Sequence, residues 1–198
     1  MATRLICKEC KNKEYKYEPL MYLSVPIMQE DELYDNIDKC FFNYFKEEIF
    51  GNEYGLTCDK CKRNNSFKKK IVITMSPHIL IVHLKRFGYS NEGMIKLQHM
   101  VNYQLTSLDV TKYTHNKNKT VYDLFGICLH RGSLNFGHYY SIVYDNAISK
   151  WVFCDDYKSK VIEQNELKGR IKNPEAYLLF YIKRDLDYFK RQTLKNYL

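Results

Sequence analysis

The chain has 198 residues, a formal net charge of +8, 18 tyrosines and 11 phenylalanines, but only 8 glycines and 4 prolines. This composition is typical of a globular, strand-rich protein and excludes collagen-like and disordered chains. Basic residues cluster only at 60–70 and from Lys183 onward, so we expect solvated basic faces and no nucleic-acid partner.

The distribution of apolar residues and cysteines indicates the cellular compartment. No apolar run approaches the roughly 20 residues of a membrane span, and the N-terminus has no signal-peptide pattern, so we expect no membrane partner. Seven cysteines is an odd number, and four of them form two Cys-x-x-Cys pairs, which favours metal binding over disulfides. The sequence therefore predicts a reducing compartment, cytoplasmic and/or nuclear.

The two Cys-x-x-Cys pairs are Cys7 with Cys10 and Cys58 with Cys61. Each pair presents two thiolates to one ion, and two pairs complete the tetrahedral set of a structural zinc site. Four unrelated free cysteines are the alternative, which the matched spacing disfavours. A redox role is disfavoured further, because two Cys-x-x-Cys pairs without a βαβ context do not fit a redox motif. We predict one structural Zn ion, bound by two hairpin tips that a long insertion brings together.

Between the cysteine pairs the pattern predicts a strand and then a helix. Residues 18–27 alternate as a strand that ends at Pro26. Asp31 is the expected N-cap of the helix. The apolar residues of the helix recur at helical spacing: Leu33, Ile37, Phe41, Tyr44, Phe45 and Ile49. Cys40 falls beside this stripe and is expected to be a packed core thiol.

Two strands, 67–75 and 78–87, are predicted on either side of a turn at Ser76-Pro77. The second begins with a continuous apolar run, as in a central strand that is covered on both faces. His83 lies in that run and is expected to be half-buried and hydrogen-bonded, not a metal ligand. Residues 88–95 are predicted to form a loop. A further short strand is expected around Leu97, Val101 and Tyr103.

The C-terminal part of the chain adds two buried strands and a short helix. A strand at 122–130 contains Cys128, and the glycine-bracketed segment 131–137 is a flexible loop that could gate a cleft. A short helix at 163–170 and a core strand at 176–182 follow. The whole pattern predicts a mixed, mostly antiparallel α+β chain.

A hairpin brings an imidazole and a carboxylate together near the C-terminal end. If its turn centres on residues 146–147, His138 lies opposite Asp155, whereas a turn one residue longer places Asp156 there. Because cross-strand Cβ atoms are only about 5 Å apart, either register permits a bond from Nδ1–H to the carboxylate. This is the base and orienting group of a catalytic triad, without a nucleophile. Cys154 points to the opposite sheet face by strand alternation.

Taken together, these motifs resemble the ubiquitin-specific protease family of cysteine deubiquitinases over residues 5–184. The matching segments are the two cysteine pairs, residues 23–27, Tyr54, residues 77–87, His130 with Gly132, residues 137–140, Trp151 with Asp155 and Asp156, and residues 176–181. The resemblance implies a papain-like cysteine protease fold with fingers, palm and thumb. The zinc-bearing fingers would hold the globular part of ubiquitin, and its C-terminal tail would enter a cleft between thumb and palm.

The resemblance also implies how the chain is divided. Residues 1–184 would form a partial ubiquitin-specific protease catalytic domain, with the zinc-bearing fingers region at 5–75 and the palm with its His box at 76–184. Residues 185–198 would form a basic C-terminal tail, a loosely docked helix.

By resemblance, His138 is the general base, Asp155 orients it, and Asp156 supports the site. The reaction implied is thiol-dependent hydrolysis of isopeptide or peptide bonds at the C-terminal glycine of ubiquitin. The family's nucleophilic cysteine lies in an Asn-rich box N-terminal to the first cysteine pair, and this chain has no such box. We therefore expect the thumb to be missing and the chain to be a fragment that is inactive alone. Its partners would be ubiquitin or ubiquitinated proteins and the missing thumb half.

Two other functions remain open from the sequence. The first is a catalytically dead module that binds ubiquitin or scaffolds a complex. The second is a basic zinc-ribbon protein that contacts nucleic acid, whose binding would fall steeply with salt.

Overall fold

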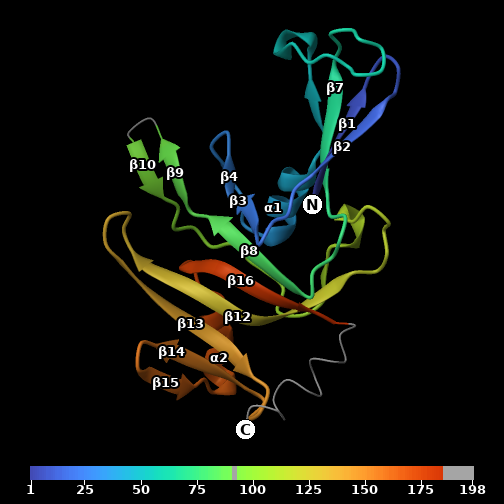
Figure 1. Cartoon of the computed structure of the whole chain (residues 1–198). Helices are drawn as coiled ribbons and strands as arrows, with labels where there is room; N and C mark the ends of the chain where they lie inside the picture. The colour runs from blue at the N-terminus through green and yellow to red at the C-terminus, as the bar shows by residue number, and fades with distance from the viewer. Residues whose placement is uncertain (91–92, 185–198) are drawn as a thin grey trace.

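Two mostly antiparallel sheets of different size dominate the computed structural model, which describes residues 1–90 and 93–184 (Figure 1). The smaller sheet projects away from the larger one, which carries the C-terminal half of the chain (Figure 1). This mostly antiparallel α+β arrangement confirms the predicted fold class.

The larger sheet has eight strands in the order β15-β14-β13-β12-β16-β8-β3, with β11 paired to β12. Its strands are β3 (Leu23–Pro26), β8 (Ile79–Lys85), β11 (Leu108–Asp109), β12 (Val121–Gly132), β13 (Gly137–Asp145), β14 (Lys150–Asp155), β15 (Lys158–Val161) and β16 (Ala176–Lys183). β3 and β8 are parallel, whereas the other neighbours are antiparallel. β8 lies between β16 and β3, which confirms that it is an interior strand. Its residues 79–84 alternate between half-buried and buried, so only one face is fully covered.

The helix α1 (Ile37–Phe45) packs its buried side chains into the main core together with β3 and β8. Its N-cap is Asn36, whose side chain accepts a hydrogen bond of 2.9 Å from Lys39 N. The predicted N-cap, Asp31, is wrong: it has a left-handed φ of 63° in the turn between two short strands. These are β4 (Met28–Gln29) and β5 (Glu32–Leu33). Asn36 is the N-cap because it directly precedes the first buried turn of the helix, where its side chain can accept a hydrogen bond from an otherwise unpaired helix amide.

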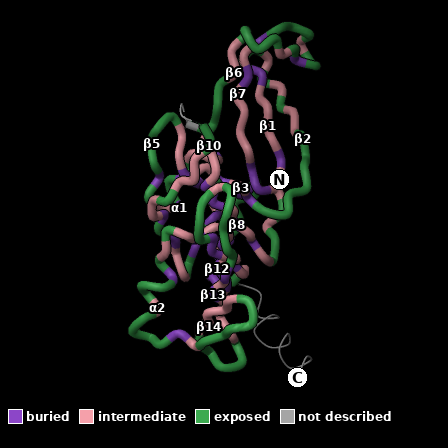
Figure 2. Tube along the Cα trace, turned by 90° about the vertical axis from the view of Figure 1, so that its left-hand side faces the viewer, coloured by how far each residue is buried: buried purple, intermediate pink, exposed green. Residues whose placement is uncertain are grey.

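The smaller sheet has the order β2-β1-β7-β6. Its strands are β1 (Ala2–Cys7), β2 (Lys13–Tyr17), β6 (Glu48–Phe50) and β7 (Phe67–Val72). The strands expected on either side of Ser76-Pro77 both exist, but β7 belongs to this sheet and β8 to the larger one. Figure 2 shows that buried residues gather around β3, β8 and β12, while the tip of the smaller sheet is largely exposed. Two 3₁₀ turns, Asn52–Tyr54 and Thr111–Tyr113, complete the connections.

Two segments around Arg86 differ from the sequence prediction, and the Arg86 side chain explains the second. The expected loop at 88–95 is a hairpin of β9 (Phe87–Ser90) and β10 (Gly93–Lys96). The expected strand around Val101 is irregular, although Val101 is fully buried. Arg86, itself fully buried, donates hydrogen bonds from Nη1 to Leu97 O and His99 O, both 3.0 Å. The guanidinium thus donates the hydrogen bonds that these two carbonyls would otherwise receive from a neighbouring strand, so the segment around Val101 can stay irregular.

The remaining elements agree more closely with the sequence. The strand predicted at 18–27 shortens to β3, whereas α2 (Gln164–Ile171) and β16 fall within a residue or two of their predicted bounds. The predicted division at residues 75 and 76 stays a prediction, and β3 from its first part pairs with β8 from its second. The predicted tail, 185–198, lies outside the described residues. Within the described chain no helix is both long and apolar enough to span a membrane.

Candidate active site and metal centre

All four cysteines of the two Cys-x-x-Cys pairs meet at the end of the smaller sheet. The sulfur atoms of Cys7, Cys10, Cys58 and Cys61 lie within 4.8 Å of one another. The Sγ atoms of Cys10 and Cys58 are 3.6 Å apart. In a tetrahedral site with metal–sulfur bonds of about 2.3 Å, neighbouring sulfurs lie about 3.8 Å apart. The donor set and its spacing therefore fit a metal ion of the zinc type.

The two cysteine pairs are built by the same local turn. Lys11 N donates to Cys7 O at 3.1 Å, and Lys62 N donates to Cys58 O at 2.8 Å. Lys11 and Lys62, each directly after the second cysteine of its pair, have left-handed φ values of 58° and 56°. Because both turns have the same hydrogen bond and the same left-handed residue, each brings the two sulfurs of its pair together on one side.

Asn65 links the two pairs and was not found by sequence reasoning. Its buried Nδ2 donates to Cys7 Sγ at 3.3 Å and to Cys61 Sγ at 3.0 Å. Amide donors of this kind stabilise the negative charge on metal-bound thiolates and orient them. The position of Asn65 just after the second pair is its only sequence signal.

The three other cysteines are free thiols in strands or the helix. Cys40 is fully buried on α1, which confirms the predicted core thiol, and burial raises its pKa to about 12. Burial likewise raises the pKa of Cys128 in β12. Both remain protonated and unreactive near neutral pH. Cys154 pairs with Ser141 across the β13–β14 ladder.

His138 and Asp155 are in contact, with Nε2 2.5 Å from Oδ1. Both predicted registers of this hairpin are nevertheless wrong. The ladder closes at Asp145↔Lys150 around a four-residue turn, and its last pair is Ser141↔Cys154. Asp155 therefore reaches His138 diagonally and not from the directly opposite position.

Local hydrogen bonding explains the longer turn. The Asp145 carboxylate accepts a hydrogen bond of 2.8 Å from Ala147 N. Ser149 adopts a left-handed φ of 53° before the return strand. An aspartate that binds the amide two residues later favours a turn of this type over a two-residue turn.

The imidazole uses a different nitrogen from the one predicted. Asp155 binds Nε2 and not Nδ1, so Nδ1 has no hydrogen-bond partner in the described part of the chain. The hydrogen bond to Asp155 raises the pKa of His138, the nearby Asp156 charge adds to the rise, and Arg131 opposes it. Asp156 lies in the turn after β14 with a left-handed φ of 49° and joins the same group of side chains. The structure thus gathers all three side chains of the predicted site, and their roles stay predictions.

Two glycines shape the hairpin that carries His138. Gly132 has a φ of 112°, and a Cβ there would lie 2.4 Å from Phe136 O. A Cβ on Gly137 would lie 2.0 Å from Nε2 of the buried His130 ring. The segment predicted as a flexible loop is therefore a short turn, closed by a bond of 2.8 Å from Ser133 N to Phe136 O.

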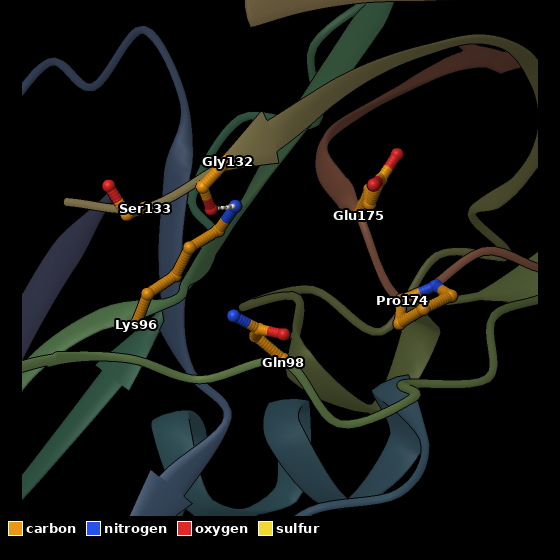
Figure 3. A pocket seen from close by; sticks show the side chains of 6 residues that line it. All are labelled: Lys96, Gln98, Gly132, Ser133, Pro174 and Glu175. Atoms are coloured by element: carbon orange, nitrogen blue, oxygen red, sulfur yellow. Dashed lines mark hydrogen bonds between the residues drawn. The ribbon is translucent and has the colours of Figure 1, made fainter. Parts of the chain in front are cut away.

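A cavity of about 360 Å³ lies beside this hairpin. It is lined by Lys96, Gln98, Gly132, Ser133, Pro174 and Glu175. In Figure 3 the Lys96 side chain extends across one side of the cavity to Gly132, and Glu175 lies on the far side. The cavity thus separates the end of β10 from the segment that precedes β16.

Fold and site together define a class of protein: an α+β domain with an imidazole–carboxylate pair and a cluster of four thiols. The family model described as "Ubiquitin carboxyl-terminal hydrolase" matches residues 1–181. The chain belongs to the ubiquitin carboxyl-terminal hydrolase family, which confirms the resemblance seen in its motifs.

Similar proteins cover most of this chain. Ubiquitin carboxyl-terminal hydrolase 12 of Saccharomyces cerevisiae is 34% identical over 155 residues, 76% of this chain and 12% of the relative. Ubiquitin carboxyl-terminal hydrolase 2 of Gallus gallus is 30% identical over 182 residues, 91% of this chain and 50% of the relative. This chain thus spans half or less of the length of these relatives.

The solved structure of a SAGA DUB module of Ubp8, Sgf11, Sus1 and Sgf73 bound to ubiquitin aldehyde contains a similar chain. It superposes with a TM-score of 0.78 at 26% identity and covers 92% of this chain and 40% of that chain. The likeness therefore extends over nearly the whole fold of this chain.

Proposed function

We propose that this chain is part of the catalytic domain of a cysteine-type deubiquitinase. Its reaction is the hydrolysis of isopeptide or peptide bonds at the C-terminal glycine of ubiquitin. The observation that carries the proposal is the contact between His138 and Asp155 in a chain of this family. Such a pair is the base and orienting group that a thiol nucleophile requires.

In this mechanism Asp155 accepts a hydrogen bond from Nε2–H of His138, so Nδ1 carries the lone pair that takes the proton of a cysteine thiol. The thiolate attacks the carbonyl carbon at the ubiquitin terminus. The imidazolium then protonates the leaving amine as the C–N bond breaks, and a water molecule activated by the same imidazole hydrolyses the thioester. The raised pKa of His138 supports this role, because the Asp155 hydrogen bond stabilises the imidazolium that forms. Asp156 adds negative charge beside the ring.

The nucleophile is proposed to come from polypeptide outside these 198 residues, on a thumb half that packs beside His138. Burial of Cys40 and the raised pKa of Cys128 support this, since neither thiol ionises readily. The four clustered cysteines are occupied by the metal centre. His138 is about half exposed, with 47% of its side chain accessible, so a second segment has access to its ring. The chain alone is therefore expected to be inactive.

The metal centre is proposed to hold one structural zinc ion, bound by Cys7, Cys10, Cys58 and Cys61. The ion supplies folding free energy by joining two turns that are distant in sequence. None of the cysteines in the described chain forms a disulfide, which supports a reducing location, the cytoplasm and/or the nucleus. Ubiquitin or a ubiquitinated protein is the proposed partner.

The test compares the chain alone with a fusion to the part of the Gallus gallus relative that this chain does not match, using a ubiquitin–fluorophore substrate. We expect no turnover by the chain alone and turnover by the fusion. Labelled ubiquitin titrated into both proteins measures binding independently. Binding by a folded fusion that never turns over substrate would overturn the enzyme proposal and favour a dead ubiquitin-binding module.

A further inference from the structure

Among the described residues, the end of the β12–β13 hairpin (residues 130–132 and 137–140) has no neighbouring strand on either side. β12 and β13 pair as far as Gly132↔Gly137. β16 pairs with β12 only as far as Leu129, and β14 pairs with β13 only as far as Ser141. An isolated two-stranded hairpin is marginally stable in water. Because His138 lies on this end, other contacts must fix its position.

Lys96 binds the open edge of β12. Its Nζ donates to His130 O at 2.8 Å and to Gly132 O at 2.7 Å. These carbonyls are two residues apart on β12, so both point to the same edge of the strand. That edge faces away from β13 and is the one along which β16 pairs up to Leu129. His130 N points the same way and donates to Glu175 O at 2.9 Å. Lys96 and the backbone at Glu175 thus take the place of a neighbouring strand.

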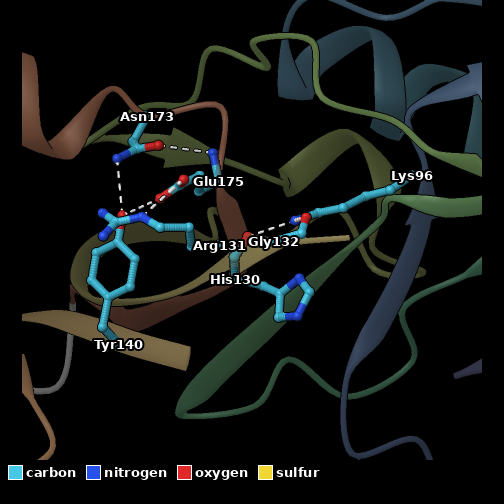
Figure 4. A network of polar contacts seen from close by, with 7 residues as sticks. All are labelled: Lys96, His130, Arg131, Gly132, Tyr140, Asn173 and Glu175. Carbon is cyan, nitrogen blue, oxygen red and sulfur yellow. Dashed lines mark hydrogen bonds and ion pairs between the residues drawn. The ribbon is translucent and has the colours of Figure 1, made fainter. Parts of the chain in front are cut away.

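Glu175 joins the two strands of the hairpin to each other, as Figure 4 shows. Its carboxylate accepts hydrogen bonds from Arg131 Nε, at 3.3 Å, and from the Tyr140 hydroxyl. Arg131 lies directly opposite His138 in the ladder, and Tyr140 follows His138 by two residues on β13. Asn173 stabilises this arrangement with two hydrogen bonds. Its Nδ2 donates to the Tyr140 hydroxyl at 3.3 Å, and its Oδ1 accepts from Glu175 N at 2.8 Å.

We propose that Lys96 and Glu175 are positioning residues that hold the hairpin end and thereby place His138 against Asp155. Lys96 fixes the β12 edge from a different hairpin, β9–β10. Glu175 fixes the β12 and β13 strands together from the segment before β16. The consequence for catalysis rests on the proposed role of His138, whereas the positioning itself can be tested without substrate.

Amide hydrogen exchange in the whole chain gives that test. Because the N–H and C=O of His130 face away from β13, Arg131 and His138 form the hydrogen-bonded pair of the ladder. By the same alternation, Ile127 and Ile142 form a bonded pair inside the sheet.

The variant K96M keeps the side-chain length but removes both hydrogen bonds. It should accelerate exchange at the amides of Arg131 and His138 about tenfold and leave Ile127 and Ile142 unchanged. E175Q should act on the same amides. K96R, which retains the donors, should restore slow exchange.

The matched controls are K160M and E163Q, which alter exposed side chains of β15 and the start of α2. Neither should change exchange in the hairpin. Exchange at Arg131 and His138 that is as slow in K96M and E175Q as in these controls would overturn the proposal. Equal acceleration at Ile127 and Ile142 would also overturn it, since Lys96 would then act on global stability alone.

In the active fusion, K96M should lower kcat and leave KM within about twofold, because it displaces the base without removing a substrate contact. A raised KM with unchanged kcat would contradict positioning. If the fusion shows no turnover at all, the proposed function fails, and the exchange result still decides whether Lys96 and Glu175 hold the hairpin.

Discussion

Arg86 offers the clearest test of how this fold is stabilised, because it is a fully buried charge without a carboxylate partner in the described chain. Its Nε donates to Ala176 O at 2.6 Å, and its Nη1 donates to Leu97 O and His99 O, both at 3.0 Å. Burial lowers its pKa to about 10, so the group stays protonated at neutral pH. The guanidinium therefore ties the start of β16 to the irregular segment after β10.

Replacing Arg86 by methionine keeps the apolar stem and leaves three carbonyls without their donor. Each lost hydrogen bond contributes about 1 kcal/mol, so the gross loss is about 3 kcal/mol. The methionine also removes the desolvation cost of a buried charge, which offsets part of this loss of free energy. We expect R86M to lower the free energy of unfolding by about 2 kcal/mol.

Urea unfolding followed by fluorescence of Trp151, the single tryptophan, measures this loss. K85M is the matched control, because Lys85 is exposed and directly precedes Arg86. We expect it to change stability by less than about 0.5 kcal/mol. An R86M chain as stable as K85M would refute the reasoning, since the carbonyls would then have found other donors.

Three further predictions concern the two sites. Chelator, or the variant Cys58→Ser, should lower the melting temperature in a thermal scan, and an unchanged value would argue against a structural metal. NMR titration should place the pKa of His138 above its ordinary 6.5, and D155N should lower it. The stability that this pair contributes is full below pH 6.5 and is lost as pH rises through the folded pKa. A pKa equal in both proteins would contradict the contact. G137A should destabilise the chain by about 1–3 kcal/mol, whereas G169A, with open space around it, should not. Equal urea midpoints would contradict this packing.

Residue spacing was enough to predict which side chains meet at both places, because the chemistry of each site restricts the residue types that can be combined. Four thiols in two equal pairs have few uses other than one metal ion. A histidine and an aspartate on the arms of one hairpin are close in any nearby register. That tolerance is why His138 and Asp155 were correctly paired although the register and the ring nitrogen were both wrong.

The features that were missed depend on contacts between distant segments. β1 and β2 form a projecting sheet with few fully buried side chains, so they have no strong apolar alternation. The helix start and the hairpin turn were decided by single side-chain caps, Asn36 and Asp145. Lys96 and Glu175 bind backbone carbonyls and side chains that are distant in the sequence. Single polar residues with such partners produce no periodic pattern from which their contacts could be predicted.

The central claim is that His138 is the base of a thiol hydrolase completed by a cysteine from outside this chain. The most direct measurement is the rate of fluorophore release from ubiquitin by the active fusion, with and without His138→Gln. Removal of a general base should slow release at least about hundredfold while ubiquitin binding persists. Equal rates in the two proteins would contradict the claim.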